Sequence, residues 1–154
     1  MAPRLYKKKS YYRGSRDKYS VEQQAGQLSI PGNQQAWVQV VPDTTVGGMR
    51  KVKHLTVSLA TNGTGGSTVG YWALVYVPQG TSPNTLTLTG SSMYEPNQFV
   101  LNCGTFDTDA GPVRFHSPVS RNLNSGDKIV LIIANPYGSD SVYYYVTRYA
   151  ITLQ

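Results

Sequence analysis

Apolar and polar residues alternate along much of the chain after residue 26, which is typical of β-strands rather than helices. The clearest example is segment 50–61, where Leu55, Val57 and Leu59 take every second position and polar side chains lie between them. Because side chains of a strand point alternately to its two faces, this spacing predicts a strand with one face in a core.

Eight segments have strand character, and none has convincing helical periodicity. They are residues 36–41, 50–61, 68–77, 85–89, 98–105, 112–117, 129–134 and 142–153. Within the third, residues 71–77 (YWALVYV) are apolar throughout, which predicts a strand buried on both faces. Short strands at this spacing predict an all-β protein. Both a jelly roll and an immunoglobulin-like sandwich fit the pattern.

The chain has 154 residues, enough for one domain with a sizeable core. It carries 14 basic and 8 acidic residues. The first 19 positions contain seven of the basic residues but only one acidic residue, Asp17. The rest of the chain therefore has seven basic and seven acidic residues and is formally neutral. A cationic segment attached to a neutral body is suited to holding a polyanion.

Residues 1–20 are predicted to form a basic, tyrosine-rich arm that is disordered or extended, and residues 21–154 the folded domain. Tyrosines stand among the cations, so the favoured polyanion is single-stranded nucleic acid, with bases stacking on the rings. Packing of the same rings against neighbouring subunits is an open alternative. The predicted arm contacts are Arg4, Lys7, Lys8, Lys9, Tyr11, Tyr12, Arg13, Arg16 and Lys18.

Three further cations, Arg50, Lys51 and Lys53, begin the second predicted strand and are the best nucleic-acid contacts in the body. An ordinary solvated strand end explains them equally well.

Composition argues against catalysis and against a bound metal or cofactor. The histidines His54 and His116 have no cysteine or carboxylate at metal-ligand spacing, and Cys103 has no partner for a disulfide. Cys103 is predicted to be a buried, inert thiol rather than half of a Cys–His pair. No segment is apolar enough to span a bilayer, and the N-terminus does not match a secretory signal. We therefore expect no enzyme, no metal, no cofactor and no membrane partner.

Three segments make the chain similar to a known group: residues 71–80 (YWALVYVPQG), 93–98 (MYEPNQ) and 120–127 (SRNLNSGD). In this order and spacing they resemble the capsid proteins of circovirus-like small circular single-stranded DNA viruses. The likeness runs over about residues 50–154, and the arm matches in character rather than in sequence.

The resemblance implies a single eight-stranded jelly roll of two four-stranded antiparallel sheets. It also implies an icosahedral T=1 shell of about sixty copies, with the arm turned inward onto a circular single-stranded DNA genome, in a virion assembled in the host nucleus. At six net charges per arm, sixty arms neutralise on the order of 360 phosphates, so a longer genome needs further cations from the body or from small ions.

Two other functions fit the residues. A non-viral β-barrel module that binds single-stranded nucleic acid explains the arm without a shell. A β-sandwich that binds a carbohydrate or a receptor leaves the arm unexplained. The sequence does not identify a host receptor.

Overall fold

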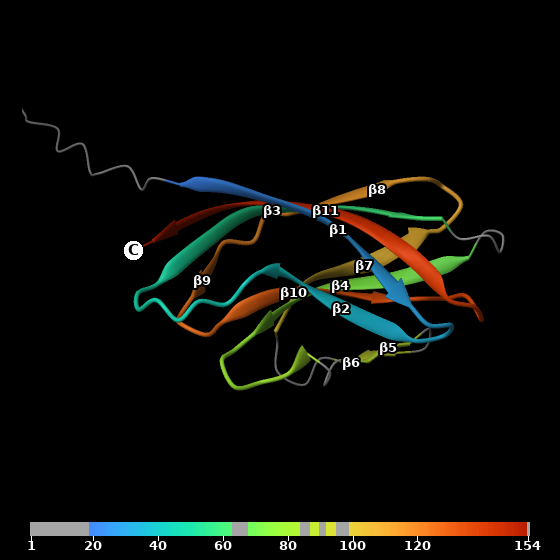
Figure 1. Cartoon of the computed structure of the whole chain (residues 1–154), viewed down its shortest axis with the longest axis horizontal. Helices are drawn as coiled ribbons and strands as arrows, with labels where there is room; N and C mark the ends of the chain where they lie inside the picture. The colour runs from blue at the N-terminus through green and yellow to red at the C-terminus, as the bar shows by residue number, and fades with distance from the viewer. Residues whose placement is uncertain (1–18, 63–67, 84–86, 90–91, 95–98, 154) are drawn as a thin grey trace, which may run out of the picture.

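The computed structural model describes residues 19–62, 68–83, 87–89, 92–94 and 99–153 (Figure 1). These residues form eleven strands: β1 Ser20–Ile30, β2 Gln35–Val41, β3 Arg50–Thr61, β4 Val69–Val77, β5 Thr87–Thr89, β6 Ser92–Tyr94, β7 Val100–Asp107, β8 Val113–Ser117, β9 Arg121–Leu123, β10 Lys128–Ala134 and β11 Ser141–Leu153. No helix in the described part of the chain has the length and apolar character needed to cross a membrane.

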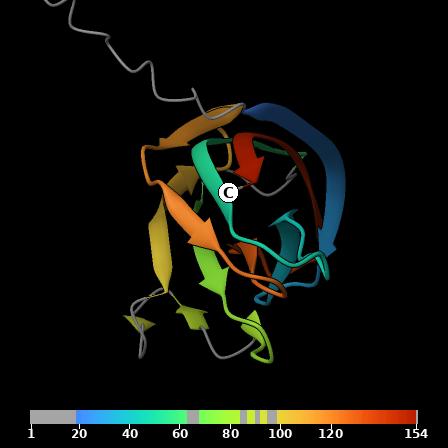
Figure 2. The ribbon, with the colours of Figure 1, turned by 90° about the vertical axis from the view of Figure 1, so that its left-hand side faces the viewer.

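The strands build two facing antiparallel sheets, seen from the side in Figure 1 and along their length in Figure 2. One has the order β1-β11-β3-β8, with β9 also paired to β3, and the other has the order β2-β10-β4-β7. The first four strands alternate between the sheets, so β1 and β3 lie in one layer and β2 and β4 in the other, and the last two strands, β10 and β11, are divided in the same way. This winding is that of a jelly roll and confirms the all-β prediction.

The expected number of strands per sheet needs one correction. The first sheet has five strands rather than four, because β8 and β9 pair with different parts of β3. Together they fill one edge position, interrupted at residues 118–120. A separate hairpin of β5 and β6 lies outside both sheets.

The start of the domain also differs from the sequence pattern. Strand β1 begins at Ser20, six residues before the pattern becomes recognisably β, and pairs with β11 over eleven residues. Its side chains are exposed from Ser20 to Ala25, so no buried face marks it in the sequence. Backbone hydrogen bonds to β11 hold it in place.

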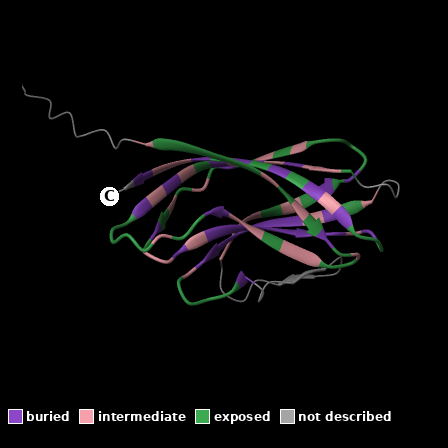
Figure 3. Cartoon of the chain, viewed as in Figure 1, coloured by how far each residue is buried: buried purple, intermediate pink, exposed green. Residues whose placement is uncertain are grey.

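The main core is formed by residues of both sheets, and Figure 3 marks the buried residues along their strands. Trp72 of β4 stacks on Phe115 of β8 with ring centroids 3.7 Å apart, which joins the two layers. Strands β4 and β10 are buried on both faces, as predicted for 71–77. Their second face forms a smaller cluster that includes Val75, Val130 and Ile132 and lies on the outer side of the four-stranded sheet.

A buried asparagine ties two loops together at one end of the sandwich. The amide nitrogen of Asn135 donates to the carbonyl oxygens of Ile30, Pro31 and Ser139 at 2.9–3.1 Å. Its oxygen accepts hydrogen bonds from the Tyr137 backbone N–H and the Tyr143 hydroxyl. Burial, with the nearby Tyr137 hydroxyl, raises the pKa of Tyr143 to about 12, so this phenol remains a neutral donor.

Candidate nucleic-acid interface

The structure locates three of the twelve predicted contact residues. The nine arm residues from Arg4 to Lys18 lie outside the described residues. Arg50, Lys51 and Lys53 lie at the start of β3, in the five-stranded sheet, but their side chains point in different directions.

Arg50 points into the fold, where it is 7% exposed. Its guanidinium donates to the carbonyl oxygen of Pro42 at 2.8 Å and to that of Asp127 at 3.0 Å, while Nε has no hydrogen-bond partner. Arg50 thus joins the β2–β3 loop to the turn before β10. Because Arg50 is buried and its donors are directed at backbone oxygens, its charge is not presented on the surface of the sheet.

Lys51 and Lys53 reach the outer face because of an irregularity at His54. The pairing of β3 with β11 shifts between Arg148 and Ala150, and His54 has a left-handed φ of 54°. An inserted residue reverses the alternation beyond it, since the side-chain period of a strand is two. Without this bulge, the two lysines would share a face with the buried Leu55.

Two arginines that sequence analysis did not select join the lysines on this surface. Arg148 of β11 lies opposite Thr56 of β3, and Arg114 of β8 lies opposite Ser58. Both arginines are exposed. The residues on either side of Arg148 are buried, and those on either side of Arg114 are half-buried. We call the surface formed by Lys51, Lys53, Arg114 and Arg148 the basic face.

The two histidines lie among these cations. The rings of His54 and His116 are stacked with centroids 6.2 Å apart, and His116 Nδ1 is 3.0 Å from the Thr56 hydroxyl. Both side chains are exposed.

Charge is separated between the two sheets. Of the seven cations after residue 19, six lie in the five-stranded sheet, and only Lys128 lies in the other. The strands of the five-stranded sheet hold a single carboxylate, Glu22. It lies opposite the buried Tyr149 and therefore on the inner face of the sheet, away from the cations. The basic face therefore has no acidic side chain from its own strands, although the body as a whole is neutral.

The chain enters the body beside the basic face. The ammonium group of Lys53 lies 4.8 Å from the centroid of the Tyr19 ring, which is a cation–π contact. Tyr19 is the residue before β1 and follows directly on the cationic N-terminal segment. The cationic segment therefore joins the body at the basic face.

Two other cations are directed elsewhere. Arg121 lies over the ring of Tyr76 at 4.2 Å, on the inner side of the sheet. Lys128 lies 5.6 Å from the centroid of the Trp37 ring on the four-stranded sheet.

The structure corrects the prediction for Cys103, whose side chain is exposed rather than buried. It lies on β7 opposite Ala73, in the four-stranded sheet, whereas both histidines belong to the five-stranded sheet. A Cys–His nucleophilic pair is thus not formed. The described residues also contain no cluster of three or more His, Cys, Asp or Glu side chains that could hold a metal ion.

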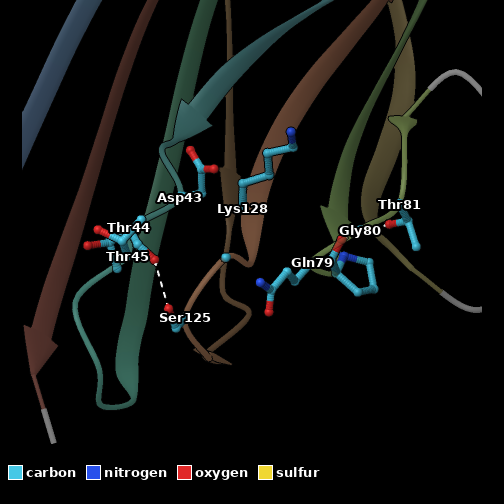
Figure 4. A pocket seen from close by; sticks show the side chains of 10 residues that line it. Asp43, Thr44, Thr45, Gln79, Gly80, Thr81, Ser125 and Lys128 are labelled. Atoms are coloured by element: carbon cyan, nitrogen blue, oxygen red, sulfur yellow. Dashed lines mark hydrogen bonds between the residues drawn. The ribbon is translucent and has the colours of Figure 1, made fainter.

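A cavity of about 410 Å³ opens at one end of the sandwich, between the β2–β3, β4–β5 and β9–β10 loops (Figure 4). One carboxylate, Asp43, and one ammonium group, Lys128, line it together with threonine hydroxyls and the Gln79 amide. The Ser125 hydroxyl donates to the Thr44 carbonyl at 3.1 Å, which closes one side. The charges of Asp43 and Lys128 cancel, so the cavity lacks the excess of cations that binding of a polyanion requires.

Comparison with known proteins gives little beyond this geometry. No family model matches the sequence, and no curated protein matches it. Among solved structures, one named Desmodium yellow mottle tymovirus covers 99% of this chain and 95% of its own, with a TM-score of 0.42 and 12% identity. A likeness at this level does not assign a function.

Proposed function

We propose that the protein is the coat subunit of a small virus, and that it packages circular single-stranded DNA with its N-terminal arm and its basic face. The observation that carries the proposal is the separation of charge. Six of seven body cations lie in one sheet, four of them on its outer face, and the cationic arm joins the body at that same face.

The basic face supplies the cations that the arm alone lacks. With seven cations in the arm and four on the face, each subunit presents up to eleven to phosphates. Each phosphate contact on a single strand contributes about −0.7 to the slope of log affinity against log salt. Exposed Tyr144, opposite Gln27 on the same side of the sheet, adds a ring on which a base can stack.

The salt dependence of oligonucleotide binding tests the assignment of the face. In the full chain, replacing Lys51, Lys53, Arg114 and Arg148 together by glutamine is expected to flatten the slope by about 2.8. The matched control is Lys128→Gln, which removes one cation from the other sheet and should change the slope little. An unchanged slope in the fourfold variant, with its fold intact by circular dichroism, would remove the basic face from the proposal.

Shell assembly is the second half of the proposal. We expect about sixty copies to close into an icosahedral T=1 particle with the arm and basic face inside, assembled in the host nucleus and carried in the virion. Electron micrographs of purified protein should show megadalton particles. Deletion of residues 1–18 should leave a folded protein that protects little DNA from nuclease, and normal DNA protection in that deletion would refute packaging by the arm.

The basic face also supports a second function, a non-viral module that binds single-stranded nucleic acid. Such modules combine a cationic surface with exposed aromatic side chains on the folded domain. Here the exposed Arg148 and Tyr144 lie on the same strand, β11. Size in solution separates the two functions, because the module would bind oligonucleotides at tens of kilodaltons without forming particles.

A further inference from the structure

Strand β1 has an open edge along its whole length. It pairs with β11 on one side through eleven consecutive residues without a register shift, and no described strand pairs with its other side. In Figure 2 it forms the outer rim of the five-stranded sheet. At eleven residues it is longer than the other edge strands, β2 with seven, β7 with eight and β8 with five.

The direction of the backbone groups on β1 follows from one side-chain contact. The Thr147 hydroxyl of β11 donates to the carbonyl oxygen of Gln24 at 3.5 Å, so the backbone groups of Gln24 face β11. In an antiparallel strand, the N–H and C=O of one residue point to the same side, and the side alternates along the chain. The odd-numbered residues from Val21 to Ser29 therefore direct five N–H and five C=O groups toward the open edge.

This edge lacks the features that keep edge strands from pairing. It has no lysine, no proline and no bulge, and its only charge is Glu22. Two apolar side chains are exposed on and beside it, since Val21 is 58% exposed and Val146 on β11 is 41% exposed. An edge of this kind is a template for another strand.

We propose that the open edge of β1 pairs antiparallel with β1 of a second copy of this chain. The inference deepens the self-assembly in the proposed function and rests on it. Only a register centred on Ala25 pairs all eleven residues. It places Gln23 opposite Gln27 of the other copy, and Glu22 opposite Leu28, so the two carboxylates do not face each other.

The pairing has a consequence for the basic face. The symmetry axis of two antiparallel edge strands runs perpendicular to the sheet, so the two five-stranded sheets continue as one. Their outer faces then point the same way. Two basic faces and two arms would thus lie on one side of the dimer, which doubles the cationic surface available to a single nucleic-acid strand.

Cysteine cross-linking in the full chain, with Cys103→Ser as background, tests the register. Ala25 would meet its own copy across the axis at a Cα separation of about 5.5 Å, within the range of a disulfide. Val21 would be about 27 Å from its own copy. Upon mild oxidation, Ala25→Cys is expected to give a disulfide-linked dimer, and Val21→Cys, the matched control, is not. Equal cross-linking of the two variants, or none in either, would overturn the pairing.

Ala25→Pro tests the same edge without a new thiol. The Ala25 N–H faces the open edge, so the proline removes no bond to β11 but blocks pairing with a second strand. Light scattering should give the mass of one chain, 16.9 kDa, with the circular dichroism of the parent. An Ala25→Pro protein that assembles like the parent would overturn the inference. Oligonucleotide binding by this monomer reports separately on the basic face, so a failure of either idea is recognisable.

Discussion

Asp127 anchors the turn before β10, where its carboxylate accepts three hydrogen bonds. One carboxylate oxygen accepts from the Tyr76 hydroxyl at 2.7 Å and the Asn124 N–H at 2.8 Å, and the other from the Gln79 N–H at 3.0 Å. Burial alone would raise the pKa of Asp127. The hydrogen bonds from Tyr76, Asn124 and Gln79, together with the charge of Arg50, outweigh burial and hold this pKa below its usual range.

The informative change is Asp127→Asn, which keeps the size of the side chain and removes its charge. The amide oxygen can still accept from Tyr76 and Asn124, but the amide nitrogen then faces the Gln79 N–H, donor against donor. A hydrogen bond to a charged group contributes about 1.5–3 kcal/mol, and an unsatisfied buried donor costs about 1–3 kcal/mol. We therefore expect the free energy of unfolding to fall by about 2–4 kcal/mol at pH 7.

The pH dependence has a definite sign. The pKa of Asp127 is lower in the folded chain than in the unfolded chain, where it is about 3.9. The carboxylate therefore contributes its full stability above that value and loses it as the pH falls through the folded-state pKa. The difference in stability between the parent and Asp127→Asn should shrink below about pH 4.

Urea unfolding followed by tryptophan fluorescence measures this difference, because Trp72 is buried against Phe115. Both proteins must be compared at one concentration, since association shifts apparent stability. Tyr76→Phe serves as the matched control. It removes one of the three bonds and leaves the charge, so its effect should be smaller. A difference that is as large at pH 3 as at pH 7 would refute the role given to the charge.

Two further predictions concern buried contacts at the sheet edge and its loops. Asn135→Ala removes the side chain that binds three backbone carbonyls and the Tyr143 hydroxyl, so unfolding by urea should show a loss of about 3–5 kcal/mol. The exposed Asn122→Ala should change stability by less than about 0.5 kcal/mol, and similar values for both would contradict the assignment. Gly26→Ala would place a Cβ against the Tyr145 hydroxyl and should cost about 1–3 kcal/mol. Adding Tyr145→Phe should recover part of that loss; no recovery would show that the strain lies elsewhere.

Strands with an alternating or continuous run of apolar residues could be predicted from the sequence, whereas β1, β6 and β9 could not. Strands β3 and β11 alternate and β4 and β10 are continuously apolar, and the pattern located all four to within a residue or so. Strand β1 buries almost nothing between Ser20 and Ala25 and is held by backbone bonds to β11. The pairing of backbone groups leaves no trace in a hydrophobic pattern.

The basic face was only partly accessible to sequence reasoning. Net charge adds all faces together, so a neutral body concealed a one-sided arrangement of cations. Arg114 lies between the apolar Val113 and Phe115, and Arg148 alternates with the tyrosines of its strand, which indicates that both point outward. Only the topology places their strands in the same sheet. Strict alternation assigns Lys51 and Lys53 to the wrong side, because the bulge at His54 depends on the pairing with β11.

The lone thiol of Cys103 lies on the sheet opposite the basic face, where it is exposed. Because of this placement, labelling of the thiol reports which sheet of the subunit faces the outside of a particle. If lysines and arginines line the interior of a closed particle, a bulky maleimide added from outside should label Cys103 in every copy while the particle stays intact. Were the orientation inverted, the same reagent would label only dismantled protein.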